Sequence, residues 1–135
     1  MSKIINFKNA ELKNISDFLF KLKLTGRASR GRNKLLVEME HKAETFYNDL
    51  QELKEECYQK NDGTGKTELK AGLTKQEVDE KLKELGQDMA GVNVEEFSDK
   101  IKALYQALDG YEEPFEGLDA VCYDRIMDLL EEIEL

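Results

Sequence analysis

The sequence predicts a mostly helical protein, all-α or nearly all-α, in which four to five helices form a hairpin or small bundle. Three observations support this prediction. Apolar residues recur at alternating steps of three and four along most of the chain, which is the spacing of one helix face. The 135 residues include a single proline, the residue that most strongly interrupts helices. Short clusters of Gly, Asn and Asp separate the periodic segments and mark turns.

Length and composition predict a single soluble domain over residues 1–135. Apolar residues make up 40% and charged residues 36% of the chain, which is too apolar for a disordered protein. No stretch approaches the roughly 18 consecutive apolar residues of a spanning helix, and residues 1–10 lack the apolar run of a signal peptide. We therefore expect a cytoplasmic protein with no membrane contact, in which Cys57 and Cys122 are reduced residues on apolar helix faces.

The first predicted helix covers residues 9–24. Its apolar residues recur at steps of three and four and share one face: Leu12, Ile15, Leu19 and Leu22. Before it, residues 3–7 are either a short strand or an ordered lead-in. After it, Thr25 and Gly26 give a stop signal, because glycine readily adopts the left-handed conformation that closes a helix.

A long second helix is predicted to end at Lys60. It begins either near Ala28 or near Lys34, and the later start gives a helix over residues 35–60. Its apolar residues form a heptad seam over three repeats: Leu36, Met39, Ala43, Phe46, Leu50, Leu53 and Cys57. We expect residues 36–57 to be one continuous helix with Phe46 and Leu50 buried. The seam packs either on the chain's own helices or on a second copy in a small homo-oligomer.

Residues 61–73 are predicted to form a turn or minor β-hairpin, because Asn, Asp and Gly are dense in their first half. Within them, residues 63–67 read Gly-Thr-Gly-Lys-Thr, which ends like a phosphate-binding loop. That loop needs another glycine upstream, where this chain has Lys60, and a buried strand before it. We therefore interpret the segment as a hairpin turn.

The remaining residues, 74–135, are predicted to form an acidic helical part. Thr74 and Glu77 are predicted to make a capping box that opens one helix. The spacing of its apolar residues predicts an inner face of Val78, Leu82, Leu85 and Met89. A weaker cap near Asn93 opens the next helix. A loop that contains glycine and proline precedes the last helix, which is predicted over residues 118–133.

No residue pattern predicts catalysis. The single histidine, His41, is expected to point outward from the long helix, because it lies off the apolar seam. Pairs of adjacent acidic residues are typical of solvated helix faces, since neighbours in sequence do not face each other on a helix. We expect no enzyme activity, no metal site and no cofactor.

Charge is divided unevenly along a chain whose net charge is −9. Residues 1–34 hold nine Lys and Arg against two acids, a net of +7, and residues 35–135 hold eleven against twenty-seven, a net of −16. A basic elbow is predicted at residues 25–34, and six cations in and beside it form the candidate partner-binding site: Lys21, Lys23, Arg27, Arg30, Arg32 and Lys34. Guanidinium groups suit carboxylates and phosphates. The alternative is that these cations close the end of the first helix and neutralise the chain's own acids.

The elbow carries a resemblance. Residues 20–34, FKLKLTGRASRGRNK, resemble the hallmark stretch of a family of small uncharacterised proteins encoded by phages and prophages of Gram-positive bacteria. The likeness extends loosely to residues 6–12, to the Glu-rich helix that follows, and to the acidic tail around Tyr123 and Asp124. Genes of this family tend to lie near tail and lysis genes, which implies a phage role. The family offers no catalytic or binding residues to transfer.

The leading hypothesis is a non-enzymatic helical interaction or structural accessory protein of a phage or prophage. Its partner is a phage or host protein, it acts in the bacterial cytoplasm, and association with the virion stays open. One alternative is a nucleic-acid-directed protein that uses the basic residues 21–34, although the net charge of −9 opposes such binding. Another is an acidic mimic that blocks a DNA-binding host protein, since residues 109–135 hold ten acids against Arg125 alone.

Overall fold

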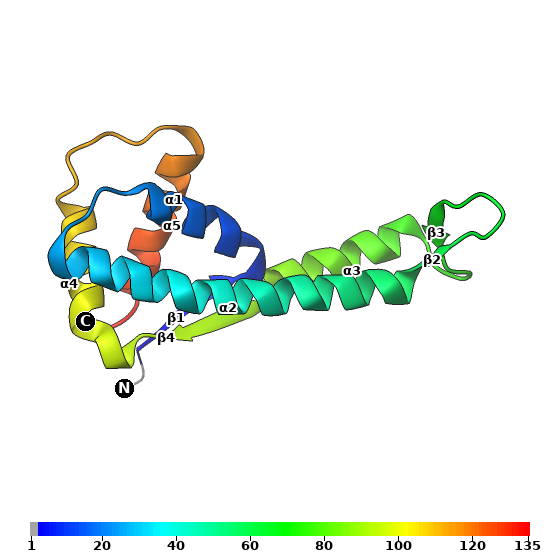
Figure 1. Ribbon diagram of the computed structural model, residues 1–135, viewed down its shortest axis with the longest axis horizontal. Helices are drawn as coiled ribbons and strands as arrows, with labels where there is room; N and C mark the ends of the chain where they lie inside the picture. The colour runs from blue at the N-terminus through cyan, green and yellow to red at the C-terminus, as the bar shows by residue number, and fades with distance from the viewer. Residues whose placement is uncertain (1–2) are drawn as a thin grey trace.

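Helix α2 (Gly26–Cys57) is the longest element and links two parts of the molecule, a body and a projecting arm (Figure 1). The computed structural model describes residues 3–135. The N-terminal part of α2 shares the body with α1 (Leu12–Lys21), α4 (Ser98–Asp109) and α5 (Gly117–Glu131). The C-terminal part forms the arm with α3 (Lys75–Gln87). The prediction of a mostly helical protein is confirmed, but these helices do not form a simple bundle.

A small antiparallel sheet joins two distant segments in the body. Strand β1 (Ile4–Lys8) pairs with β4 (Met89–Asn93), so that Ile5 stands opposite Val92 and Phe7 opposite Ala90. These four side chains are buried on the face of the sheet that adjoins the core. The strand alternative for the lead-in is therefore correct. Strand β4 was not predicted, and Met89, which the spacing placed on a helix face, is an exposed strand residue.

Short 3₁₀ helices lead into two of the body helices. One, Asn9–Glu11, precedes α1, and the other, Glu95–Phe97, precedes α4. Glu11 accepts two hydrogen bonds from the Arg125 guanidinium, both at 2.9 Å, and one from the backbone N–H of Lys8 at 2.8 Å. The hydrogen bond with Glu11 raises the pKa of Arg125 above its ordinary range. This ion pair ties α5 to the start of α1.

The hydrophobic core lies entirely in the body. It draws on β1, α1, the first half of α2, β4, α4 and α5, and within the described chain it includes no residue between Met39 and Ala90. An aromatic group closes its outer side, where Phe18 of α1 meets Phe115 and Tyr123 edge to face. The Tyr123 hydroxyl donates to the carbonyl of Leu108 at 2.7 Å, and burial is the main cause that raises the pKa of Tyr123.

Helices α2 and α4 approach each other closely at Gly31. A Cβ atom added there would overlap the carbonyl oxygen of Lys100 and lie 2.8 Å from its carbonyl carbon. Ala28, one turn earlier on α2, is also buried. Small residues at these positions therefore let the two helix backbones come together.

The arm consists of the C-terminal part of α2, the hairpin β2 (Tyr58–Lys60) and β3 (Thr67–Leu69), and α3, which returns antiparallel to α2 (Figure 1). The continuous helix predicted over residues 36–57 is confirmed, but its predicted end at Lys60 is wrong, because residues 58–60 form β2. The predicted burial of Phe46 and Leu50 is wrong, since both are only half-buried. Along the arm, the seam has one neighbouring helix, α3, so its flanks there stay open to solvent. The arm's buried residues are few: Cys57, Val78 and Gly86.

The loop between β2 and β3 is a hairpin turn, as predicted for residues 63–67. The Asn61 side-chain oxygen accepts hydrogen bonds from the backbone N–H groups of Gly63 and Thr64, at 2.9 and 3.3 Å. Gly65 has a φ of +71°, which suits glycine. At the start of α3, the Thr74 hydroxyl accepts from the N–H of Glu77 at 3.2 Å, which confirms the Thr74 half of the predicted capping box.

Candidate functional site

The predicted basic elbow is mostly helix. Residues 26–34, which were assigned to an elbow ahead of the long helix, are the first turns of α2. Gly26 has a φ of +58° and opens the helix, whereas Gly31 lies inside it at the contact with α4. Of the two predicted starts of the long helix, the one near Ala28 is close to the observed start at Gly26. The elbow predicted over residues 25–34 is wrong, because two glycines among arginines resemble a loop. The true elbow is the short connection after Lys21, residues 22–25.

Two of the six candidate cations stabilise the fold itself. One Arg32 nitrogen, Nη1, donates to the carbonyls of Leu19 and Leu22, both at 2.9 Å, and so satisfies acceptors at the end of α1. The Lys21 ammonium lies 2.7 Å from the Asp119 carboxylate of α5. For Arg32, the alternative of closing the first helix is therefore correct.

The other four cations are exposed: Lys23, Arg27, Arg30 and Lys34. Within residues 3–135, none of them lies within 4.0 Å of a carboxylate. Arg27, Arg30 and Lys34 are separated by three and four residues, so they share one side of α2. The elbow thus divides into cations that hold the fold and cations that face solvent.

This division predicts different costs for two neighbouring substitutions. Arg32→Ala should lower the free energy of unfolding by about 1–3 kcal/mol, because it removes a charged donor from two carbonyls next to the core. Arg30→Ala should change it by less than about 0.5 kcal/mol, as is usual for an exposed side chain without a partner. Urea denaturation of both variants measures the difference. Equal losses would show that Arg32 does not hold the end of α1.

A second surface lies in a shallow groove between α1 and α2. Its apolar lining consists of Phe20, Leu36, Ala43 and Tyr47, and its volume is about 490 Å³. Phe20 is 76% exposed and Tyr47 48% exposed. Exposed aromatic residues that cluster in this way are typical of protein-binding surfaces. This groove was not predicted from the sequence, although Phe20, an aromatic residue off the apolar face of α1, was a signal for it.

Polar side chains line the rim of the groove. On α1, the Lys13 ammonium lies 3.1 Å from the Asp17 carboxylate, and this hydrogen bond raises the pKa of Lys13 above its ordinary value of 10.5. Glu40 lies on the α2 side of the rim, and Ser16 lies between, where its hydroxyl donates to the sulfur of Met39 at 3.9 Å. The groove can therefore accept an apolar side chain while its rim makes polar contacts.

The structure also places the single histidine and the two cysteines. His41 is exposed on α2, as predicted. Cys57 and Cys122 are both free and buried, and burial is the main cause that raises the pKa of the Cys122 thiol, which opposes reactivity. Within residues 3–135, no group of three or more His, Cys, Asp or Glu residues could hold a metal ion.

Comparisons with known proteins assign nothing further, because no family model, no curated protein and no solved structure matches the chain. None of the helices within residues 3–135 has the length and apolar character needed to cross a membrane. The groove and the exposed cations therefore carry the functional argument.

Proposed function

We propose that the chain is a non-enzymatic helical interaction protein of a phage or prophage, which binds a protein partner in the groove between α1 and α2. The observation that carries this proposal is the pair of exposed aromatic rings, Phe20 and Tyr47, on the two walls of one groove. The groove lies where the arm leaves the body. Its walls are two packed helices, so little ordering is needed when a partner binds.

The size of the effect favours the groove over scattered surface contacts. Covering an aromatic side chain removes roughly 150–250 Å² of its surface from water. At about 25 cal/mol per Å², covering Phe20 alone contributes a few kcal/mol of binding free energy. Tyr47 adds a hydroxyl group that can hydrogen bond at the edge. By comparison, an exposed ion pair contributes at most about 1 kcal/mol.

The resemblance of residues 20–34 to phage and prophage proteins supports the proposed setting. In that setting the partner is a phage or host protein in the bacterial cytoplasm, and the virion is the alternative location. The structure adds a physical reason for the stretch, because Gly31 and Arg32 serve helix packing while Phe20 lies in the groove.

The test is affinity capture of partners from phage-producing cells, quantified by mass spectrometry. Phe20→Ser and Tyr47→Ser should each lower the recovered partner at least about tenfold, the effect of losing roughly 1.4 kcal/mol. Both residues are exposed, so the fold should be retained, which circular dichroism verifies. Val121→Ser on α5 is the matched control, since Val121 is 63% exposed and lies outside the groove. Unchanged recovery with both groove variants would contradict the proposal.

Nucleic acid is the second candidate partner, because three unpaired cations share one side of α2: Arg27, Arg30 and Lys34. The net charge of −9 opposes it. A gel shift that is tight at moderate salt, falls steeply as salt rises and disappears when all three residues become Ala would favour this candidate.

A further inference from the structure

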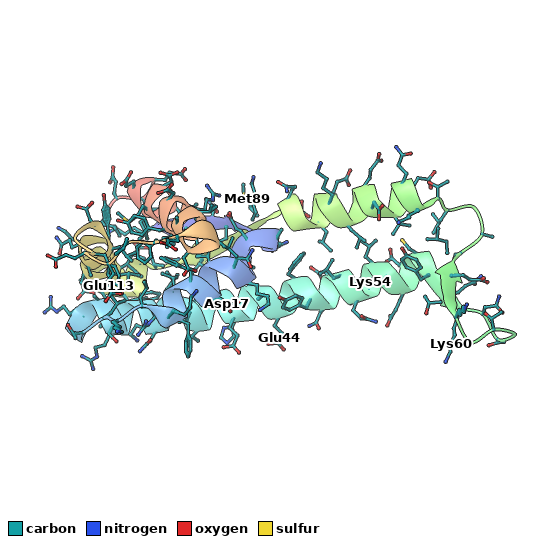
Figure 2. All side chains as sticks on the ribbon, turned by 90° about the horizontal axis from the view of Figure 1, so that it is seen from above. Asp17, Glu44, Lys54, Lys60, Met89 and Glu113 are labelled. Atoms are coloured by element: carbon teal, nitrogen blue, oxygen red, sulfur yellow. The ribbon has the colours of Figure 1, made fainter. Side chains whose placement is uncertain are left out.

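The solvent-facing side of α2 carries a line of exposed residues at helical spacing, here called the outer stripe: Arg27, Arg30, Lys34, Val37, His41, Glu44, Asn48, Glu52 and Glu55. It lies on a different side of the helix from the groove residues Leu36, Ala43 and Tyr47. Figure 2 shows α2 along one long edge of the molecule, with α3 on its other side. The stripe is basic as far as Lys34, has Val37 and His41 at its centre, and carries acidic residues from Glu44 onward.

This order of charges opposes the dipole of the helix. The N-terminus of a helix favours acidic side chains and the C-terminus favours basic ones, each by about 0.3–1 kcal/mol. The first turn of α2 has no acidic residue, and Arg27 and Arg30 lie at this end instead. Near the C-terminus, Glu52 and Glu55 outnumber the single base Lys54. The stability of the helix itself therefore does not account for the order.

The chain's own carboxylates and amines do not account for it either. Within residues 3–135, the charged residues of the stripe form no ion pair closer than 4.0 Å. The seam and the groove use other sides of the helix. What remains is a surface whose two ends carry opposite charge and face solvent.

We propose that a second copy of this chain binds the outer stripe in antiparallel orientation, centred on His41. Arg27 and Glu55 each lie 14 residues from His41, and Arg30 and Glu52 each lie 11 residues from it. A two-fold axis at His41 therefore sets each basic residue level with an acidic residue of the other copy, at both ends of the interface. A parallel pair would instead place like charges opposite each other.

The dimensions of the stripe set the expected strength. From residue 27 to residue 55 the helix spans about 42 Å, at 1.5 Å per residue. Val37, 51% exposed, supplies an apolar contact beside the centre. One helix face buries less surface than a standard interface, and exposed ion pairs are individually weak. The dimer should therefore form at high protein concentration and weaken as salt rises.

Charge reversal tests the pairing directly. One variant carries R27E and R30E, and the other carries E52R and E55R. Sedimentation velocity of the full chain should show that each variant dimerises at least tenfold more weakly than the unmodified chain. An equimolar mixture of the two should recover the original affinity, because every contact again joins opposite charges. Both reversals place charges where the helix dipole favours them, so neither should unfold the protein.

The controls separate this pairing from general charge effects. K81E with K83E on α3 changes the net charge as much as the basic reversal, from −9 to −13, and should leave dimerisation unchanged. Measurements at about 0.01 M and 1 M salt, where the screening length is about 30 Å and 3 Å, should show loss at high salt. Three results would each overturn the proposal. These are a monomer under all conditions, a dimerisation affinity unchanged by the charge reversals, and a mixture of the two variants that dimerises no more tightly than either alone. Because the groove is not involved, failure of its partner test leaves this result unaffected.

Discussion

Replacing Gly31 with Ala should lower the free energy of unfolding by about 1–3 kcal/mol, the usual cost of overpacking. In an open helix the same change would instead stabilise by up to about 1 kcal/mol. The reason for the reversal is the contact with α4, where a methyl group would overlap the carbonyl oxygen of Lys100. A backbone carbonyl cannot turn aside as a side chain can, so the two helices must separate. Urea denaturation at equilibrium measures this loss.

Gly86→Ala in α3 is the matched control. There an added Cβ would lie 3.2 Å from the Cβ of Ala10, a contact that a small shift can relieve. The gain in helix propensity should offset that cost, and we expect a change within about 1 kcal/mol of zero. Equal stability of the Gly31 and Gly86 variants would contradict the close contact between α2 and α4 at Gly31.

Phe18→Ala should cost about 3–5 kcal/mol, the range for deleting a large aromatic side chain from a core. Phe18 is 2% exposed, and its ring centroid lies 5.1 Å from that of Phe115 and 6.5 Å from that of Tyr123. The vacated space is bounded by α1, α5 and the loop between α4 and α5, which cannot all close onto it. Urea or thermal unfolding measures the loss.

Two further phenylalanines calibrate the Phe18 result. Phe20→Ala, at a position that is largely exposed, should cost less than about 0.5 kcal/mol. Phe46→Ala should cost about 1–2 kcal/mol, because that side chain is only half-buried. A loss at Phe46 as large as the loss at Phe18 would mean that the seam of the arm is fully covered in solution.

The helices with strong apolar periodicity could be predicted from the sequence. The long helix and the last helix, predicted over residues 118–133 and found over 117–131, are examples. The β4 strand could not, because five residues with a glycine among them carry no clear period. Its partner β1 lies more than 80 residues away, so the pairing that defines it is not visible locally. Periodicity also identifies which side of a helix is covered, but not by how many neighbours, which is why the burial of Phe46 was overestimated.

Charge density selected the segment around residues 21–34, and partner binding there stays a prediction. The structure divides its cations into those that contact the fold, Lys21 and Arg32, and those that face solvent. The role of Arg32 depends on how α1 and α2 turn at the elbow, which brings two carbonyls within reach of one guanidinium. The groove depends on the same crossing, since it joins side chains of two helices. Neither arrangement follows from spacing along one helix.

Because the arm contributes no residue to the core, the length of the arm can change without altering the core. The core includes no described residue between Met39 and Ala90. After α3 the chain returns to the body as β4, which pairs with β1. Removing seven residues from each of the two antiparallel helices keeps their seam in register and shortens the arm by about 10 Å. The number of heptads in the arm therefore sets the distance between the hairpin tip and the body.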